Sequence, residues 1–321
     1  MSKTDTLGLC FLGCGNITIK HAKLAHATDK DIRLSFASRT KSKAEEFSSK
    51  YNGVHSFGSY DDALQSADVD IIMINTPPDS HFDLALKAIE NGKHVIVEKP
   101  PFYSSKDFDV LGPKADQKRL QLLVAENYFY RPLRTTLHKL FEEKVIGIPL
   151  FMNINATKKQ ENKNDWRDDK SIVKYGALYE GGIHWLSIIN NLGFSIDTYE
   201  GFNPRKDQEL ERSMQMTART TEGMVINLQY SWEVDTIFKG LRLSKIHGTE
   251  GSITFESNGI FVIARGNKKK FIFPGFSDIG GSKGMWKDFL SSIRNNALPA
   301  YTWQMAQRDL MAVETTYSTS M

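Results

Sequence analysis

The chain has 321 residues, 40% of them hydrophobic and 25% charged, with a formal net charge of +3. This length favours two domains over one core, and the mixed, near-neutral charge argues against nucleic acid or an anionic membrane as a partner. No run of about 18 apolar residues predicts a transmembrane helix, and the polar N-terminus lacks the apolar stretch of a signal peptide. The two cysteines, Cys10 and Cys14, are too few for a disulfide framework or a zinc site. We therefore expect reduced thiols, no bound metal and a cytoplasmic location.

A predicted strand over residues 7–12 is followed by a glycine turn and a helix over about 19–28. Gly13 permits a tight turn, Gly15 lets the backbone approach a pyrophosphate, and the start of the helix supplies free N–H groups. Thr18 stands where a third glycine usually completes this fingerprint. A strand, a Gly-x-Gly turn and a helix in this order predict a dinucleotide site, although a lone turn of this kind also occurs as plain structure. The expected cofactor contacts of this turn are Gly13, Gly15, Asn16 and Ile17.

The second predicted strand, residues 32–38, ends where a dinucleotide-binding fold reads the adenosine ribose. An acidic residue at this point binds the 2′-hydroxyl of NAD, whereas an arginine accommodates the 2′-phosphate of NADP. This chain has Ser38 and Arg39 here, with Lys43 nearby. We therefore expect NADP in preference to NAD. The alternative is that this segment is only the N-cap of the next helix, with exposed basic side chains.

The β-branched run 95–97 predicts a buried central strand, and it is followed by Glu98, Lys99 and two prolines. Proline cannot continue a central strand, so the chain must leave the sheet here. In open α/β sheets, ligands bind outside the carboxyl ends of the strands. Lys99 beside Glu98 is then an amine whose charge can be used or tuned. An ordinary ion pair at the end of a strand is the alternative.

Strands and helices alternate up to a last strand over 120–126, which predicts a doubly wound parallel sheet, a Rossmann fold, in a domain of residues 1–126. After this strand the pattern changes to strands joined by hairpin signals such as Asn258-Gly259. We expect residues 127–321 to form an α+β domain with a mainly antiparallel open sheet, for substrate binding and oligomerisation. Three later helices are predicted over about 178–192, 283–295 and 303–316.

Glu180 and His184 are four residues apart on the first of these predicted helices, so their side chains share a face. A carboxylate one turn away can orient an imidazole and raise its basicity. Histidine titrates near neutral pH, which suits a base that takes the proton of a substrate hydroxyl. The alternative is a helix surface pair. A metal site is rejected because the sequence offers no third ligand.

Several motifs follow one another in a fixed order along the chain. They are Gly13-x-Gly15, Thr76-Pro77 with His81, Gly92-Lys93-His94-Val95, Glu98-Lys99-Pro100, Asp165-Trp166-Arg167, Gly176-x-Leu178-x-Glu180-x-Gly182-x-His184 and Gly248-Thr249-Glu250-Gly251. Together they resemble the Gfo/Idh/MocA family, which includes glucose-fructose oxidoreductase and inositol dehydrogenase, over nearly the whole chain. The resemblance implies a Rossmann domain that holds a nicotinamide cofactor and a second domain whose open sheet often forms a dimer face. It also implies substrates that are mostly sugars, polyols or their derivatives.

Carried over residue by residue, the resemblance implies that Lys99 and His184 are the active-site lysine and histidine. Glu180 stands where most members have Asp, Ser187 where many have Asp, and Tyr175 where glycine is common. The implied catalytic residues are Lys99, His184 and Glu180. The implied further cofactor contacts are Asn75, Thr76, Pro77, His81, Glu98, Lys99 and Asn127. The implied substrate contacts are Lys99, Trp166, Arg167, Glu180 and His184, with a solvated loop cation as the alternative for Arg167.

We predict an NAD(P)-dependent oxidoreductase that transfers a hydride between nicotinamide and a secondary alcohol or carbonyl of a sugar, polyol or sugar derivative. His184 and Lys99 share the proton transfer and the stabilisation of charge on the reacting oxygen, and which of them moves the first proton is left open. The alternatives are a non-catalytic dinucleotide-binding sensor of the same fold and, more weakly, a reductase of an imine or a tetrapyrrole. The expected partners are a small-molecule substrate and further copies of the chain, as a homodimer or homotetramer.

Overall fold

The computed structural model describes residues 6–161, 166, 169, 172–236 and 240–320. It divides into two compact units, which are treated separately below. The first unit comprises residues 1–125 and 283–307, and the second comprises residues 126–282 and 308–321. The division therefore places 283–307 with the first unit, whereas the sequence assigned the whole of 127–321 to a second domain.

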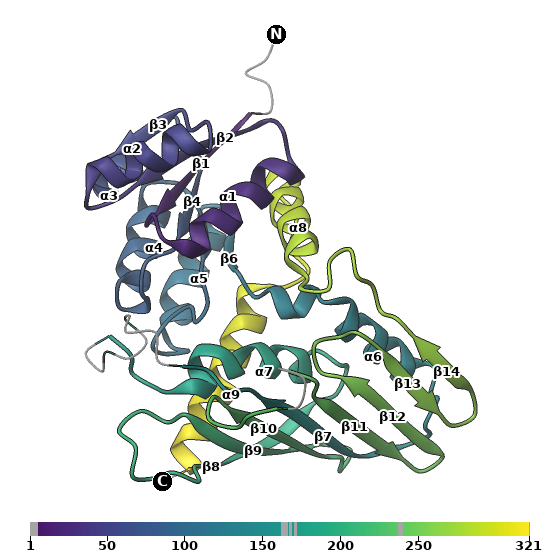
Figure 1. Ribbon diagram of the computed structural model, residues 1–321. Helices are drawn as coiled ribbons and strands as arrows, with labels where there is room; N and C mark the ends of the chain where they lie inside the picture. The colour runs from purple at the N-terminus through teal and green to yellow at the C-terminus, as the bar shows by residue number, and fades with distance from the viewer. Residues whose placement is uncertain (1–5, 162–165, 167–168, 170–171, 237–239, 321) are drawn as a thin grey trace. The chain divides into compact units, whose positions relative to one another are not determined.

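The first unit is built on a six-stranded parallel sheet in the order β3-β2-β1-β4-β5-β6 (Figure 1). This order is that of a doubly wound, dinucleotide-binding sheet, so the predicted Rossmann fold is confirmed. Its strands are β1 (Leu7–Leu12), β2 (Ile32–Ala37), β3 (His55–Phe57), β4 (Ile71–Ile74), β5 (His94–Val97) and β6 (Leu122–Val124). Its helices are α1 (Asn16–Thr28), α2 (Lys41–Lys50), α3 (Tyr60–Gln65), η1 (Pro78–Ser80), α4 (His81–Glu90), α5 (Asp107–Gln117) and α8 (Ser282–Asn295).

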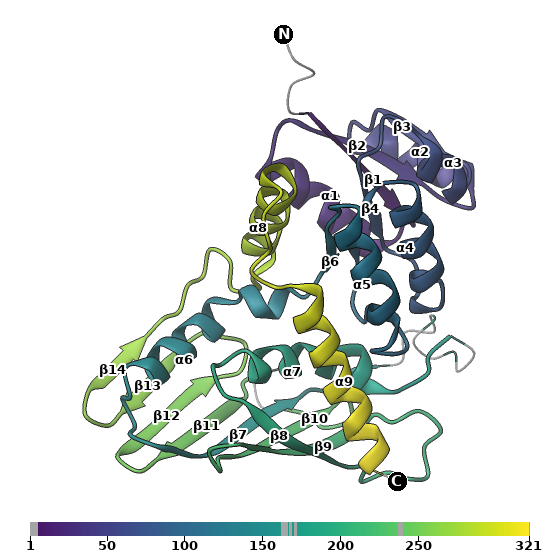
Figure 2. The same ribbon diagram turned by 180° about the vertical axis from the view of Figure 1, so that it is seen from behind.

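The middle strands β1, β4 and β5 are apolar and buried because helices cover both faces of a parallel sheet. Since the strands run in one direction, their carboxyl ends meet at one edge of the sheet. Gly13, Ser38, Asn75 and Glu98 each directly follow one of these strands and therefore share this edge. Helix α8 lies beside α1 in both views, so the C-terminal part of the chain contributes to this unit (Figures 1 and 2).

The second unit is built on an eight-stranded sheet in the order β14-β13-β12-β11-β7-β10-β9-β8. All neighbouring strands are antiparallel except β7 and β10, which pair in parallel. The predicted mainly antiparallel α+β architecture is confirmed. Its strands are β7 (Pro149–Thr157), β8 (Ile196–Phe202), β9 (Ser213–Thr220), β10 (Val225–Ser231), β11 (Leu243–Gly248), β12 (Gly251–Glu256), β13 (Val262–Arg265) and β14 (Lys269–Ile272).

Helices cover one face of this sheet, and the residues on the other face alternate with the buried ones along each strand. The helical elements are η2 (Asn127–Tyr130), α6 (Pro132–Glu142), η4 (Leu178–Gly182), α7 (Ile183–Asn190) and α9 (Trp303–Thr319), of which α9 contributes residues 308–319 to this unit. The element η4 is a π-helical turn, so the predicted continuous helix over 178–192 begins with a wider turn than an α-helix has. Within the described part of the chain, none of the helices is long and apolar enough to cross a bilayer.

Candidate active site

The turn between β1 and α1 has the geometry that a dinucleotide phosphate requires. Gly13 has φ +100°, and a Cβ on it would lie 3.1 Å from the backbone oxygen of Asn75, so only glycine fits here without strain. A Cβ on Gly15 would meet nothing within 4 Å, which leaves open space beside the backbone. Helix α1 has no side-chain cap at its N-terminus, so the N–H groups of Asn16 and Ile17 face that space without a side-chain acceptor.

Thr18, at the position of the missing third glycine, ties this turn to the end of β4. Its hydroxyl donates to the carbonyl oxygen of Gly13 at 2.7 Å and accepts from the Asn75 side-chain amide at 2.9 Å. The other side-chain atom of Asn75, Oδ1, is buried and has no hydrogen-bond partner among the described residues. A buried acceptor beside an open glycine turn fits a nicotinamide dinucleotide, because such a ligand brings donors to the carboxyl edge of the sheet. Thr18 therefore replaces the glycine without filling the phosphate space.

The residues expected at the adenosine end follow β2. Ser38 is buried and its hydroxyl accepts from the backbone N–H of Thr40 at 3.2 Å, whereas Arg39 and Lys43 are exposed. Burial raises the pKa of Tyr60, and the nearby Arg39 cation partly offsets that rise, which places the guanidinium near the Tyr60 ring. Arg39 and Lys43 therefore follow the strand end at which a 2′-phosphate would bind. Both side chains are exposed to solvent, so neither cation loses its hydration.

His81 supports two of the loops at this edge. Its Nδ1 lies 2.8 Å from the carbonyl oxygen of Pro101, and its Nε2 lies 2.8 Å from that of Thr76. Burial lowers the pKa of this histidine, although these carbonyls partly offset the effect. Because both ring nitrogens face backbone oxygens and the residue is buried, His81 holds the Thr76-Pro77 segment in place and does not present an atom to a ligand.

Glu98 and Lys99 leave the sheet together at the end of β5. One carboxylate oxygen of Glu98 accepts from the backbone N–H of Lys99 at 2.9 Å, and the other lies 2.5 Å from Nε2 of His21. Burial raises the pKa of Glu98, but the hydrogen bond from His21 and the charge of Lys99 together hold it below its ordinary value. The lysine itself is half-buried. The motif is therefore a buried, hydrogen-bonded carboxylate that fixes the lysine backbone, and not a solvated ion pair.

In the second unit, His184 is held by a carboxylate that the sequence analysis did not identify. Its Nδ1 lies 2.7 and 2.9 Å from the two carboxylate oxygens of Glu126, which also accept the backbone N–H of Tyr128. The predicted partner was Glu180, which instead lies buried in the π-helical turn η4. Burial raises the pKa of Tyr230, and the charge of Glu180 raises it further. A π turn shifts the side-chain register of an i,i+4 pair, which is why the predicted pairing was wrong.

Aromatic stacking fixes the plane of the same imidazole. The Tyr128 ring stacks on His184 with a centroid distance of 4.2 Å and an interplanar angle of 11°. The guanidinium of Arg131 lies 4.3 Å from the Tyr128 ring and donates to the backbone oxygens of Ile279 and Ser257. With Nδ1 engaged by Glu126 and the ring stacked, Nε2 is the nitrogen of His184 that can exchange a proton. No sequence pattern marks Tyr128 as the residue that stacks on this imidazole.

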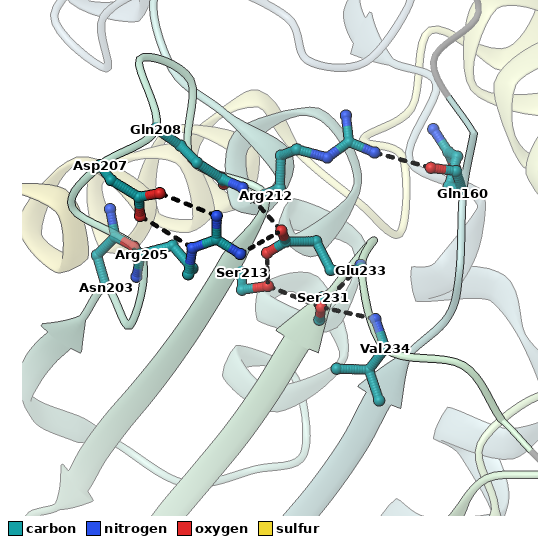
Figure 3. Close-up of polar contacts among 10 residues, drawn as sticks. All are labelled: Gln160, Asn203, Arg205, Asp207, Gln208, Arg212, Ser213, Ser231, Glu233 and Val234. Carbon is teal, nitrogen blue, oxygen red and sulfur yellow. Dashed lines mark hydrogen bonds and ion pairs between the residues drawn. The ribbon is translucent and has the colours of Figure 1, made fainter.

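A polar network supports the segment that leads into η4. The phenol oxygen of Tyr317 accepts backbone N–H groups of Gly176 and Tyr179 and donates to Glu211 at 2.7 Å. Burial raises the pKa of Glu211, which also accepts the N–H of Leu178 at 3.1 Å. Figure 3 shows the neighbouring cluster, in which Glu233 accepts from the side chains of Ser213 and Gln208 at 2.6 and 2.7 Å. The start of η4, the turn that carries Glu180, is therefore held by hydrogen bonds to Tyr317 in α9 and to Glu211 just before β9.

Three further predicted contacts are Asn127, Trp166 and Arg167. The side-chain amide of Asn127 donates to the carbonyl oxygen of Gly280 at 2.5 Å, which anchors η2 within the second unit. Trp166 is half-buried. Arg167 lies outside the described residues, so its contact with the substrate stays a prediction. Among the described residues, no group of three or more histidine, cysteine and acidic side chains could hold a metal ion.

Comparison with known proteins supports this assignment of the two units. The model of the Gfo/Idh/MocA oxidoreductase family with a NAD-binding Rossmann fold matches residues 7–126, and the model of the Gfo/Idh/MocA C-terminal domain matches residues 135–254. The trans-1,2-dihydrobenzene-1,2-diol dehydrogenase of Xenopus tropicalis is 23% identical over 280 residues, which cover 83% of this chain and 81% of that protein.

Levoglucosan dehydrogenase of Pseudarthrobacter phenanthrenivorans is 25% identical over 257 residues, covering 70% of this chain and 65% of that protein. A structure of levoglucosan dehydrogenase in complex with NADH has a TM-score of 0.85 and 18% identity, covering 98% of this chain and 97% of that one. At this identity the structural likeness establishes the fold. From the matched models over both units, the chain belongs to the Gfo/Idh/MocA family of NAD(P)-dependent oxidoreductases.

Proposed function

We propose that this chain is a dehydrogenase or reductase acting on a secondary alcohol or carbonyl of a sugar, polyol or sugar derivative, with Lys99 and His184 as its catalytic residues. The observation that carries the proposal is the Glu126–His184 pair, because a histidine held through Nδ1 and stacked on Tyr128 has the form of a general base. Two relatives, a levoglucosan dehydrogenase and a trans-1,2-dihydrobenzene-1,2-diol dehydrogenase, support a substrate that carries ring hydroxyls.

Each residue has a distinct task in this proposal. The nicotinamide, when bound, supplies the acceptor or donor of the hydride. His184 takes the hydroxyl proton at Nε2 during oxidation, and the negative charge of Glu126 stabilises the imidazolium that forms. Lys99 is proposed to donate a hydrogen bond to the reacting oxygen of the substrate and to stabilise negative charge on it. Glu180 is proposed to contact the substrate, as are Trp166 and Arg167.

Turnover of a substrate panel tests the proposal against the sensor alternative. Purified protein is mixed with NADP or NAD and with a set of aldoses, inositols and anhydrosugars, and the nicotinamide absorbance is followed. We expect turnover with at least one polyhydroxylated substrate. Tight cofactor binding by calorimetry without turnover on any of them, in either direction, would instead indicate a dinucleotide sensor.

Arg39 is proposed to set a preference for NADP over NAD. Arg39→Ala is expected to weaken NADP binding about tenfold to a hundredfold, because a charge-assisted hydrogen bond to the 2′-phosphate contributes about 1.5–3 kcal/mol. The dissociation constant of NAD should change little. Lys50→Ala, which removes an exposed cation from the C-terminal end of the following helix α2, is the matched control. Both constants can be measured by fluorescence titration. Equal weakening of both cofactors would contradict the assignment.

The outer face of the eight-stranded sheet is proposed to bind a second copy of the chain. It carries side-chain amides around a shallow pocket of about 510 Å³, among them Asn153, Asn227 and Gln229, together with Lys245 and the half-exposed Phe151. Such a face suits pairing with itself, since opposed amides can donate to and accept from one another. Gln229→Arg is expected to raise the dimer dissociation constant at least about tenfold, because a two-fold axis brings like charges together.

Light scattering after size-exclusion chromatography measures this effect on the oligomer. The exposed Gln117, in the first unit, provides the control substitution Gln117→Arg with the same charge change. An unchanged oligomer in Gln229→Arg would contradict this face as the interface.

A cytoplasmic location stays a prediction based on the two unpaired cysteines.

A further inference from the structure

A buried chain of hydrogen bonds leads from helix α8 to the backbone of Lys99, entirely within the first unit. The indole Nε1 of Trp286 lies 3.0 Å from Nδ1 of His21, on helix α1. The opposite ring nitrogen of His21, Nε2, lies 2.5 Å from one oxygen of Glu98, whose other oxygen accepts the N–H of Lys99. Trp286 is fully buried, and His21 and Glu98 are buried as well. Neither His21 nor Trp286 was singled out from the sequence.

The chemistry of the indole fixes the proton positions along this chain. An indole N–H can only donate, so Nδ1 of His21 must be the acceptor and must carry no proton. The ring proton of a neutral His21 is then on Nε2, from which it is donated to Glu98. Protonation of Nδ1 would break the hydrogen bond from Trp286 inside a buried site, where a lost hydrogen bond is costly. The geometry therefore holds His21 neutral.

A neutral His21 has a consequence for the charge of Glu98. The ionisable groups that face this carboxylate are His21, Lys99 and His81, and burial disfavours the charged form of His81. With His21 neutral, the ammonium of Lys99 is a cation that balances the Glu98 carboxylate. An imidazolium at position 21 would instead compete with Lys99 for the same negative charge.

We propose that Trp286 and His21 are positioning residues for Lys99, which act through Glu98. Trp286 keeps His21 in its neutral form, His21 orients the Glu98 carboxylate, and the carboxylate fixes the backbone from which the lysine side chain extends. This inference rests on the proposed catalytic function of Lys99. The arrangement of the hydrogen-bond chain can nevertheless be tested without any substrate.

Trp286→Phe is the decisive variant, because it keeps an aromatic ring and removes only the N–H donor and part of the ring volume. By nitrogen-15 NMR of labelled histidine, His21 of the natural protein should carry its ring proton on Nε2, with an unprotonated Nδ1 that accepts from Trp286. In Trp286→Phe, the Nδ1 resonance should shift, because this hydrogen bond is lost. A proton on Nδ1 in the natural protein, or an Nδ1 resonance that is the same in Trp286→Phe, would overturn the proposal whether or not a substrate is known.

The kinetic counterpart separates positioning from simple destabilisation. In Trp286→Phe, kcat should fall about tenfold, because a small misplacement of a catalytic group is costly, while the KM for the cofactor stays within about twofold. A change in the cofactor KM as large as the loss of kcat would argue for a merely structural role. Trp303→Phe is the matched control, since it removes an indole N–H that bonds the exposed Asp116 in the same unit.

A second pair of variants keeps the proposal testable if Trp286→Phe folds poorly. In His21→Gln, the amide can accept from Trp286 through its oxygen and donate to Glu98 through its nitrogen, as the neutral imidazole does. This variant should keep kcat within about threefold of the natural protein, whereas His21→Ala should lose about tenfold or more. Equal activity of the two variants would show that the hydrogen-bond chain does not position Lys99.

Discussion

Replacement of His184 by asparagine is expected to lower kcat/KM about a thousandfold, the range in which a general base contributes to catalysis. The asparagine amide can still donate to Glu126, so the local hydrogen bond is retained while the group that exchanges the proton is lost. The dissociation constant of the cofactor should stay within about twofold, because His184 belongs to the second unit and the dinucleotide turn to the first. Steady-state rates and a fluorescence titration of the cofactor measure the two effects.

Glu126→Gln serves as the companion variant for this prediction. The substitution is nearly isosteric, but the neutral amide no longer stabilises an imidazolium and can turn its own donor toward Nδ1. We expect a loss of about a hundredfold in kcat, again with unchanged cofactor binding. Activity of His184→Asn within about tenfold of the natural protein would rule out His184 as the base.

Replacement of Lys99 by alanine is expected to lower kcat by about a hundredfold to a thousandfold, because it removes the donor that stabilises charge on the reacting oxygen. The backbone N–H of residue 99 remains, so the hydrogen bond to Glu98 and the exit of the chain from β5 are retained. Removal of the ammonium also takes away a cation that balances the buried Glu98 carboxylate, so the melting temperature should fall as well. Lys99→Arg keeps the charge and separates this effect from the loss of catalysis. Absorbance assays with the best substrate of the panel measure the effect.

Two control variants make the lysine result specific. Lys93→Ala removes a different lysine just before the same strand, whose ammonium donates to the backbone oxygens of Ser66 and Val69. It should lower the melting temperature but leave kcat largely intact, because its contacts lie at the opposite end of β5. Lys99→Arg keeps the charge but changes the reach and geometry of the donor. Undiminished activity in Lys99→Ala would remove this residue from the mechanism.

The alternation of strands and helices made most of the first unit predictable from the sequence. Each of the predicted strands after β1 lies within about two residues of its observed place, because buried parallel strands give continuous apolar runs. The strand β3 was missed, since His55–Phe57 is only three residues long and none of its side chains is fully buried. The membership of residues 283–307 in the first unit had no local signal, because packing between distant segments leaves no periodicity in either segment.

The candidate site was predictable only where its residues adjoin in the chain. Gly13, Gly15 and Lys99 each lie within three residues of the end of a strand, at the carboxyl edge of the sheet. Glu126, by contrast, lies 58 residues from His184, and nothing in its neighbourhood marks it as the partner of an imidazole. The spacing of four residues predicted Glu180 as the partner of His184, because side chains four apart share a face of an α-helix. The π-helical turn η4 changes this spacing, so the prediction did not hold. Local periodicity therefore predicted the elements, while long-range hydrogen bonds decided the partners.

The place of α8 in the first unit has a consequence for biosynthesis. Residues 1–125 leave the ribosome long before Trp286 is translated, so the pocket around His21 stays incomplete until most of the polypeptide has emerged. A chimaera that grafts only residues 1–125 onto a relative would pair His21 with a foreign helix. Exchange of the nucleotide-binding half between relatives should therefore transfer residues 283–307 along with it.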